Sequence, residues 1–484
     1  MDHLNKRGSS SLISSLAEGL RKLFPSTFSI AIALTVITFI LALWLTTTVD
    51  FSGSVSAFYQ DVATDPLSTS GNHFLQLLGF WYKGMWNPGL LAFAIQMMLI
   101  LVLGYVLAST AVFRKLMFRL LVLCSSTAKS AFLVTLITLL VSLFNWGLGL
   151  IFGAIFARKV GEYASSRNRM MNYPLVAAAG YSGLMVWHGG ISGSAPLKVA
   201  EQGHFLALVG KDIPAIDMGQ TTFSTMNILI ALVLLIVLPA VMYWIGRKNE
   251  KTISPAFRLP APASERLEEQ SGLPPLAGAE RIDYSRIAGI GLGIALLAVA
   301  AYKAVLAGAF SVLDPNYLNF ILLGFCLLFS GTIAGFLKRV GEAMEASAGI
   351  LIQFPLYFGI MGIMKYSGLV ALFSESLINI STVATFPLFT FISAALVNIF
   401  VPSGGGQWVV QGPIIVEAAQ NLGASLPKAV MALAYGDQVT NMLQPFWALP
   451  LLGITGLKPK DILPYTLLLM GIGTIIFMAG LLVL

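Results

Sequence analysis

Residues 398–408 read NIFVPSGGGQW and interrupt a long apolar segment of the chain. Pro402 and the three glycines at 404–406 cannot continue a helix. Broken backbone survives within a bilayer only inside protein or beside a water-filled cavity, because every peptide group needs a partner. A second polar run, YGDQVTN at 435–441, interrupts the next apolar segment. The two runs together predict a binding site within the membrane. The alternative is a glycine-rich loop at the membrane surface.

The composition is that of an integral membrane protein. The chain has 484 residues, of which 57% are apolar and 11% are charged, whereas soluble domains carry roughly 25% charged residues. The net charge of +7 is therefore attributed to cytoplasmic loops and not to a nucleic-acid partner. Cys124 and Cys326 stand in or beside apolar runs, so neither a disulfide framework nor a thiolate metal site is indicated.

The apolar runs predict an all-α fold with about nine spanning helices and two re-entrant hairpins. The hairpins are expected at 130–157, with its tip at 145–149, and at 377–420, with its tip at 403–406. Residues 48–87 are expected to form a mostly polar loop, and glycines predict that the second half of the segment 172–190 is unwound. The spans are expected at about 27–47, 88–109, 172–190, 223–245, 286–308, 317–337, 348–370, 428–450 and 462–483.

The order of elements repeats, which predicts two inverted halves. Asn145 and Asn398 are separated by the same number of positions as Pro174 and Pro427. A single connecting helix at 286–308 inverts the second half relative to the first, an arrangement typical of secondary transporters. The predicted divisions are an N-terminal segment (1–26, an amphipathic surface helix or a disordered tail), a first repeat (27–246), a linker (247–285), the connecting helix (286–308) and a second repeat (309–484).

The basic residues orient the chain. Most of the 29 Lys and Arg residues fall in the N-terminal segment and in certain loops. The predicted topology places these loops on the same side of the membrane as the N-terminal segment. Because cytoplasmic loops are enriched in Lys and Arg, we expect a cytoplasmic N-terminus and a periplasmic C-terminus. The first hairpin then enters from the cytoplasm and the second from outside.

Three motifs resemble those of the bacterial short-chain fatty acid transporter family: GYSGLMVWHGG at 180–190, VPSGGGQW at 401–408 and YGDQVTN at 435–441. The resemblance implies uptake of acetoacetate, butyrate and similar monocarboxylates. Through the larger ion-transporter superfamily it also implies a homodimer in which a transport domain slides against a scaffold in an elevator motion. Dicarboxylate members of that superfamily carry Ser-Asn-Thr at the hairpin tips. This chain has Asn-Trp-Gly and Ser-Gly-Gly-Gly there, which disfavours a dicarboxylate substrate.

The substrate anion is expected to meet neutral donors, helix N-termini or a bound cation, because the deep segments contain no Arg. A helix N-terminus offers unpaired N–H groups and about half a positive charge, and glycine lets a ligand approach the backbone. The alternative is that the glycines only let helices pack. The predicted substrate-binding residues are Asn145, Gly147, Ser182, His188, Ser403, Gly404, Gly405, Gly406, Gln407, Thr440 and Asn441.

Asp437 is the deep acid of these motifs, and an acid inside a spanning segment is functional by default. We expect it to stand where Gly436 breaks the helix and frees carbonyl oxygens, with Asn145 and Asn398 adding side-chain oxygens. These residues form the predicted cation site, for sodium at Asp437 or for a proton on Asp437 itself. A purely structural role for Asp437 is the alternative. His188 is either a structural histidine or a proton carrier.

The resulting hypothesis is a secondary active transporter in the bacterial inner membrane, which takes up short-chain monocarboxylates with a co-transported cation. A cation-coupled transporter of dicarboxylates or other organic anions is the closest alternative. No Walker loop, paired catalytic acids, zinc-type histidine spacing or nucleophile elbow appears in the sequence, so ATP-driven transport and an enzyme are disfavoured. A channel is a further alternative. The expected partners are the monocarboxylate, the lipid bilayer and a second copy of the chain, with no cofactor beyond the coupling ion.

Overall fold

The computed structural model describes residues 26–51, 59–248, 278, 280–307 and 315–484. The regular structure within these residues is entirely helical, which confirms the all-α class for this part of the chain. Nearly all of the predicted N-terminal segment 1–26, and most of the predicted linker 247–285, lie outside the described residues.

The described part of the first half contains ten α-helices and two short 3-10 helices. They are α2 (Thr27–Leu45), α3 (His73–Met85), α4 (Pro88–Ala108), α5 (Ala111–Leu123), α6 (Thr127–Phe144), α7 (Trp146–Ser166), α8 (Tyr173–Tyr181), η2 (Ser182–Met185), α9 (Ser194–Val199), α10 (His204–Val209), η3 (Met218–Gln220) and α11 (Thr225–Lys248).

The second half continues with α12 (Glu280–Asp283), α13 (Arg286–Ala307), α14 (Pro315–Ser330), α15 (Ile333–Tyr366), α16 (Leu369–Ile378), α17 (Phe386–Phe400), α18 (Gly404–Leu422), α19 (Leu426–Thr440), α20 (Pro445–Thr455) and α21 (Pro459–Val483). Within the described residues, seven helical segments are long and apolar enough to cross a membrane: α2, α4, α6, α11, α13, residues 347–366 of α15, and α21. The chain is therefore a multi-pass membrane protein. Among the nine expected spans, 172–190 and 428–450 are broken, and the helix at 317–337 has only 16 residues.

Two expectations about individual segments are wrong. Residues 48–87 are not only a loop, because α3 lies within them and packs along α15. The contact is backbone to backbone: a side chain on Gly84 of α3 would overlap the carbonyl oxygen of Phe358 in α15. The expected gap between spans 317–337 and 348–370 is also absent. Residues 338–347 are rich in Lys, Glu, Ala and Met, which favour helix, so α15 runs through them as one helix of 34 residues.

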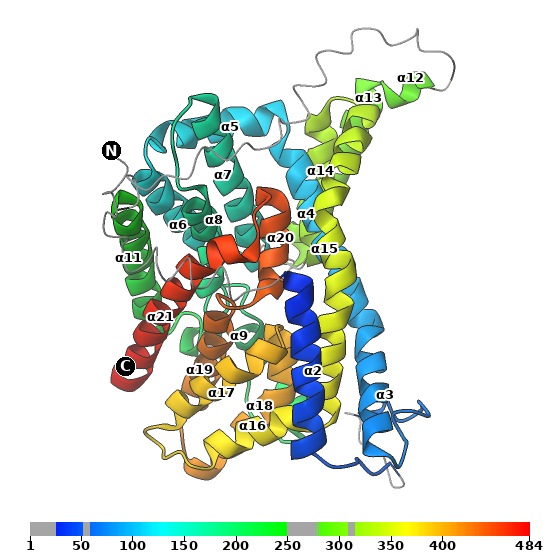
Figure 1. The fold of residues 1–484 in the computed structure, drawn as a ribbon, viewed down its shortest axis with the longest axis vertical. Helices are drawn as coiled ribbons and strands as arrows, with labels where there is room; N and C mark the ends of the chain where they lie inside the picture. Colours follow the sequence, from blue (N-terminus) through cyan, green and yellow to red (C-terminus); the bar gives the residue numbers. More distant parts are fainter. Residues whose placement is uncertain (1–25, 52–58, 249–277, 279, 308–314) are drawn as a thin grey trace, which may run out of the picture.

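The helices form two groups, which lie side by side in Figure 1. One group contains α2, α3, α4, α13, α14 and α15, in which α14 packs on both α4 and α13. The other contains the helix pairs α6–α7 and α17–α18 together with α8, α11, α19 and α21. In this second group α6 packs on α7 and α11, and α17 packs on α19. The interrupted helices therefore gather in one part of the molecule, against a wall of longer helices.

Candidate functional site

Each helix pair in the second group turns at a capped break. In the first pair, α6 ends at Phe144, and the side chain of Asn145 caps α7 by accepting a 2.9 Å hydrogen bond from the N–H of Leu148. In the second pair, α17 ends at Phe400, and Ser403 Oγ caps α18 by accepting from the N–H of Gly406 at 3.2 Å. Asn and Ser are favoured caps because their oxygens accept from N–H groups that have no helical partner.

The capping pattern places the two asparagines differently. Asn145 occupies the capping position of α7, as Ser403 does in α18. Asn398 instead lies in the last turn of α17, before the break. The equal sequence spacing that paired Asn145 with Asn398 therefore does not make them equivalent positions in the two helix pairs.

Two further helices stop inside the second group. The expected unwinding of 172–190 is confirmed, since α8 ends at Tyr181 and gives way to η2 and then to turns. The predicted break at Gly436 is wrong, because α19 continues through this residue to Thr440. A side chain at Gly436 would overlap the carbonyl oxygen of Phe391 in α17, so this glycine permits close helix packing. The real break follows Thr440, and Pro445 begins α20.

The two ionisable residues of the motifs meet at these breaks. His188 Nδ1 and Asp437 Oδ2 lie 2.6 Å apart, with the side chains 0% and 1% exposed. On the opposite side of the ring, Nε2 accepts a 3.0 Å hydrogen bond from the N–H of Ala195. Because Nε2 must present a lone pair to that donor, the proton is on Nδ1 and points at Asp437. His188 is therefore held as a neutral imidazole and supplies no positive charge to Asp437.

Besides the bond from His188 to Asp437, a second bond joins the loop that carries His188 to α19. Gln438 Oε1 accepts from the backbone N–H of His188 at 2.9 Å. Tyr181, at the end of α8, donates its hydroxyl to the carbonyl oxygen of Asn441 at 2.8 Å. The unwound segment after α8 and the break after α19 are thus joined by side chains from both sides.

The three glycines at the start of α18 have different surroundings. A Cβ on Gly404 would lie 2.7 Å from both His188 Cε1 and Trp187 Cη2. A Cβ on Gly406 would lie 3.0 Å from Ser403 Oγ. A Cβ on Gly405 would meet only Ser194, at 3.8 Å. Gly404 therefore permits close packing on the stacked rings of Trp187 and His188, whereas space remains beside Gly405.

Asn398 joins the end of α17 to the end of α19. Its Nδ2, which carries two hydrogens, has three acceptors within reach: Asp437 O at 2.6 Å, Thr440 Oγ1 at 3.0 Å and Asn441 Oδ1 at 3.0 Å. Gln444 Nε2 donates in turn to the carbonyl oxygen of Asn398. These bonds fix both amides, so Asn398 Oδ1 and Gln444 Oε1 remain as buried acceptors without a partner among the described residues. Oxygen acceptors and the negative ends of two helix dipoles thus gather here.

Four predicted site residues have other partners. Asn145 caps α7, and a Cβ on Gly147 would contact Leu318 of α14 at 3.5 Å. Ser182 Oγ donates to the carbonyl oxygen of Ala179 within its own helix turn. Gln407 Nε2 donates to Ala394 O at 2.8 Å and to Gln411 Oε1 at 2.6 Å. None of the four forms a hydrogen bond with His188, Asp437 or Asn398 in the described structure.

Tryptophans beside the polar motifs pack together where the helices are interrupted. The ring of Trp146 lies 5.2 Å from that of Trp447 and 5.9 Å from that of Trp187, centroid to centroid. Trp187 is stacked on His188 at 4.4 Å, with an 18° angle between the rings. The backbone N–H of Trp146 also donates to Ser192 Oγ at 3.0 Å. The signal in the sequence was a Trp beside each polar motif, but it does not reveal that the rings meet.

Comparison with known proteins agrees with the motifs. A family model described as "Short chain fatty acid transporter" matches residues 9–484. The chain is 37% identical to the "Putative short-chain fatty acid transporter" of Escherichia coli K12, with 94% of this chain and 96% of that protein covered. It is 39% identical to the Haemophilus influenzae protein of the same name, over 84% of this chain and 90% of that one.

Among solved structures, the Alcanivorax borkumensis YdaH transporter is similar at 15% identity and a TM-score of 0.39, with 94% and 98% of the two chains covered. The sequence relatives are much closer, and both they and the family model extend over most of the chain. The protein therefore belongs to the short-chain fatty acid transporter family.

Proposed function

We propose that this protein is a secondary active transporter that accumulates acetoacetate, butyrate and similar monocarboxylates together with a cation. The observation that carries the coupling is the burial of Asp437 beside a neutral His188. A carboxylate removed from water needs a compensating charge or a proton. Since His188 supplies no charge in this arrangement, a transported cation or proton is the proposed source.

The proposed anion site is the start of α18. The N–H of Gly406 is used by the Ser403 cap, whereas those of Gly404 and Gly405 belong to the first helical turn, whose N–H groups lack intrahelical acceptors. The space beside Gly405 leads toward Ser194. The rings of Trp187, Trp146 and Trp447 offer an apolar surface for a short acyl chain. We assign Asn145 and Gly147, at the tip of the neighbouring helix pair, to the same substrate side.

The proposed cation site lies at the opposite helix ends. The C-terminal ends of α17 and α19 meet at Asn398, where Asn398 Oδ1 and Gln444 Oε1 are buried acceptors. Sodium prefers hard oxygen ligands, and helix C-termini favour cations. The carboxylate of Asp437 belongs to α19, one turn before Asn441. A proton on Asp437 is the second candidate for the coupling ion.

The proposal extends to how the two helix groups lie in the membrane and move. We propose that the helix pairs α6–α7 and α17–α18 enter the membrane from opposite sides as parts of inverted repeats. The group that contains them would move as a transport domain against the wall formed by α4, α13, α14 and α15. A homodimer in the bacterial inner membrane, with the N-terminus in the cytoplasm and the C-terminus in the periplasm, completes the proposal. Transport of dicarboxylates or other organic anions is the alternative.

Uptake by purified protein in proteoliposomes tests the function. Labelled butyrate should accumulate when an inward sodium or proton gradient is imposed, and the ion whose gradient suffices is the coupling ion. Unlabelled acetoacetate should compete strongly, and succinate weakly. Preloaded butyrate should accelerate entry of the label by counterflow, which a channel would not show. Equal competition by succinate would favour the dicarboxylate alternative, and uptake that only follows the substrate gradient would refute coupling.

A further inference from the structure

A groove unrelated to the transport site lies on the outer surface, where the end of α5, the start of α6 and the end of α11 come together. Its volume is about 650 Å³. α6 begins beside the end of α11, where a Cβ on Gly246 would come within 2.7 Å of Ala128 Cα. The two helices thus touch beside the groove. Its mouth is open to the surroundings, because Val122, Leu123 and Tyr243 are exposed.

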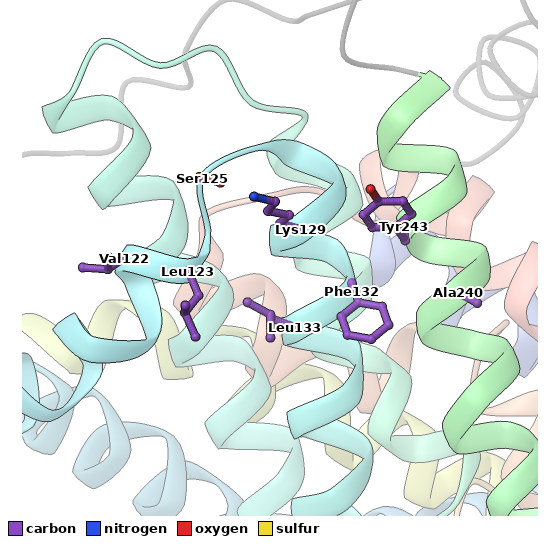
Figure 2. Close-up of a pocket in the computed structure, with 8 residues that line it drawn as sticks. All are labelled: Val122, Leu123, Ser125, Lys129, Phe132, Leu133, Ala240 and Tyr243. Atoms are coloured by element: carbon purple, nitrogen blue, oxygen red, sulfur yellow. The ribbon is translucent and has the colours of Figure 1, made fainter.

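The lining of the groove has a polar end and an apolar floor, as Figure 2 shows. Lys129, Ser125 and the hydroxyl of Tyr243 lie toward the end of the helices. Phe132 and Leu133 follow Lys129 by one helical turn, and Ala240 precedes Tyr243 by one turn. Both α6 and α11 are candidate membrane spans. The polar end therefore lies where the spans begin and end, and the floor lies deeper in the hydrocarbon.

The charge at this end has one sign. Every charged residue of α5, α6 and α11 is Lys or Arg. The ammonium group of Lys129 has no hydrogen bond or ion pair to another residue in the part of the chain that the structure describes. The last turn of α11 adds Arg247 and Lys248, with the Lys248 ammonium 3.6 Å from the Trp244 ring centroid. An anion is the ligand that such an end attracts.

We propose that this groove binds one anionic diacyl phospholipid of the surrounding membrane. The phosphate group lies at Lys129, within reach of the Tyr243 hydroxyl and Ser125, and an acyl chain lies over Phe132, Leu133 and Ala240. Basic pockets between spanning helices hold anionic head groups by charge, while the apolar floor holds the chains. A bilayer lipid fits both halves of the groove, whereas a soluble anion would leave the apolar floor facing the bilayer unfilled. The lipid would pack against α6, the first arm of the α6–α7 pair, on the face away from the transport site.

Native mass spectrometry of the full-length protein tests this site. The delipidated protein is incubated with equal amounts of phosphatidylglycerol and phosphatidylcholine, and the retained lipids are counted. Wild type should retain about five times as much phosphatidylglycerol as phosphatidylcholine. One lysine near a membrane surface favours an anionic lipid by about 1 kcal/mol, which corresponds to this ratio. Lys129→Gln should reduce that preference to near parity. Ala240→Trp, which fills the floor at an exposed position, should reduce retention of both lipids.

Two variants serve as matched controls. Lys338→Gln removes an exposed lysine of α15, which does not line the groove, and Ile236→Trp places the same bulky ring one turn deeper on α11. Both should retain lipid as wild type does, and all four variants should keep the wild-type unfolding temperature. An unchanged preference in Lys129→Gln would overturn the proposal. So would a shift in oligomeric state in Ala240→Trp with lipid retention intact, because the groove would then be an interface between copies of the chain.

Discussion

Asp437 Oδ2 accepts the Nδ1 proton of His188 at 2.6 Å, while His188 Nε2 accepts the N–H of Ala195 at 3.0 Å. The imidazole is therefore held from both sides in one neutral tautomer. To gain a second proton, its Nε2 would have to give up the bond to Ala195. In this arrangement His188 donates a hydrogen bond to Asp437 but brings no positive charge to it.

Replacing Asp437 tests the coupling. Asp437→Asn keeps the volume but removes the negative charge, so gradient-driven accumulation of butyrate should fall to the equilibrium level while counterflow exchange is partly retained. The measurement is uptake into proteoliposomes with and without an imposed gradient. Glu417→Gln, which removes an exposed acid on α18, should accumulate as wild type does. Concentrative uptake by Asp437→Asn at the wild-type rate would contradict the assigned role.

Replacing His188 tests the role of its hydrogen bond to Asp437. Asn places an amide N–H near the position of Nδ1, so His188→Asn should retain measurable uptake. His188→Leu leaves the buried carboxylate without its donor, and the free energy of unfolding should fall by about 3–5 kcal/mol. Chemical denaturation in detergent measures this difference. If both variants lose uptake but unfold as wild type does, the ring itself takes part in transport.

The glycines at the start of α18 should respond individually. Gly405→Ala adds a methyl group that meets only Ser194 at 3.8 Å, so this variant should fold and transport. Gly405→Val should abolish uptake without loss of folded protein, because its larger side chain occupies the space assigned to the substrate carboxylate. Gly404→Ala should lower the unfolding temperature, because its methyl group would press on the rings of His188 and Trp187. Normal uptake by Gly405→Val would show that the tip does not bind the anion.

Gly436 should behave as a packing glycine. In Gly436→Ala the methyl group would overlap the Phe391 carbonyl oxygen of α17, and such overpacking lowers the free energy of unfolding by about 1–3 kcal/mol. Gly471→Ala is the matched control in α21, where no atom lies within 4 Å of the added methyl group. There the helix gains about 0.5–1 kcal/mol from the replacement of glycine. Thermal unfolding should therefore shift in opposite directions for the two variants.

The orientation in the membrane can be tested with single cysteines. Cys124 and Cys326 are buried and would first be replaced. Lys338→Cys should then react with a membrane-impermeant maleimide only from the cytoplasmic side, and Val383→Cys only from the periplasmic side. Lys338 is near the start of α15, whereas Val383 follows the end of α15 and lies between α16 and α17, and both residues are exposed. Labelling of Lys338→Cys from outside would exclude the inverted arrangement of the two halves.

The sequence by itself determined much of the architecture. Apolar length predicted the membrane class and most of the long helices, because the thickness of the bilayer sets a length that composition alone reveals. The glycines and prolines predicted breaks near 182 and 404. Proline lacks the backbone N–H that a helix needs, and glycine leaves the backbone free to adopt other conformations. The motifs also indicated the family. Each of these features depends on residues that are close together in the chain.

Only the tertiary structure decided which groups meet. His188 and Asp437 lie 249 positions apart, and no local pattern shows that they share a proton. The role of Gly436 also depended on a neighbour, since a glycine inside a helix can mark a break or a close approach, and only the carbonyl oxygen of Phe391 distinguishes these outcomes. Hydrogen bonds and van der Waals contacts act over a few ångströms in space, whatever the separation along the chain. Their partners are therefore fixed by how the helices pack.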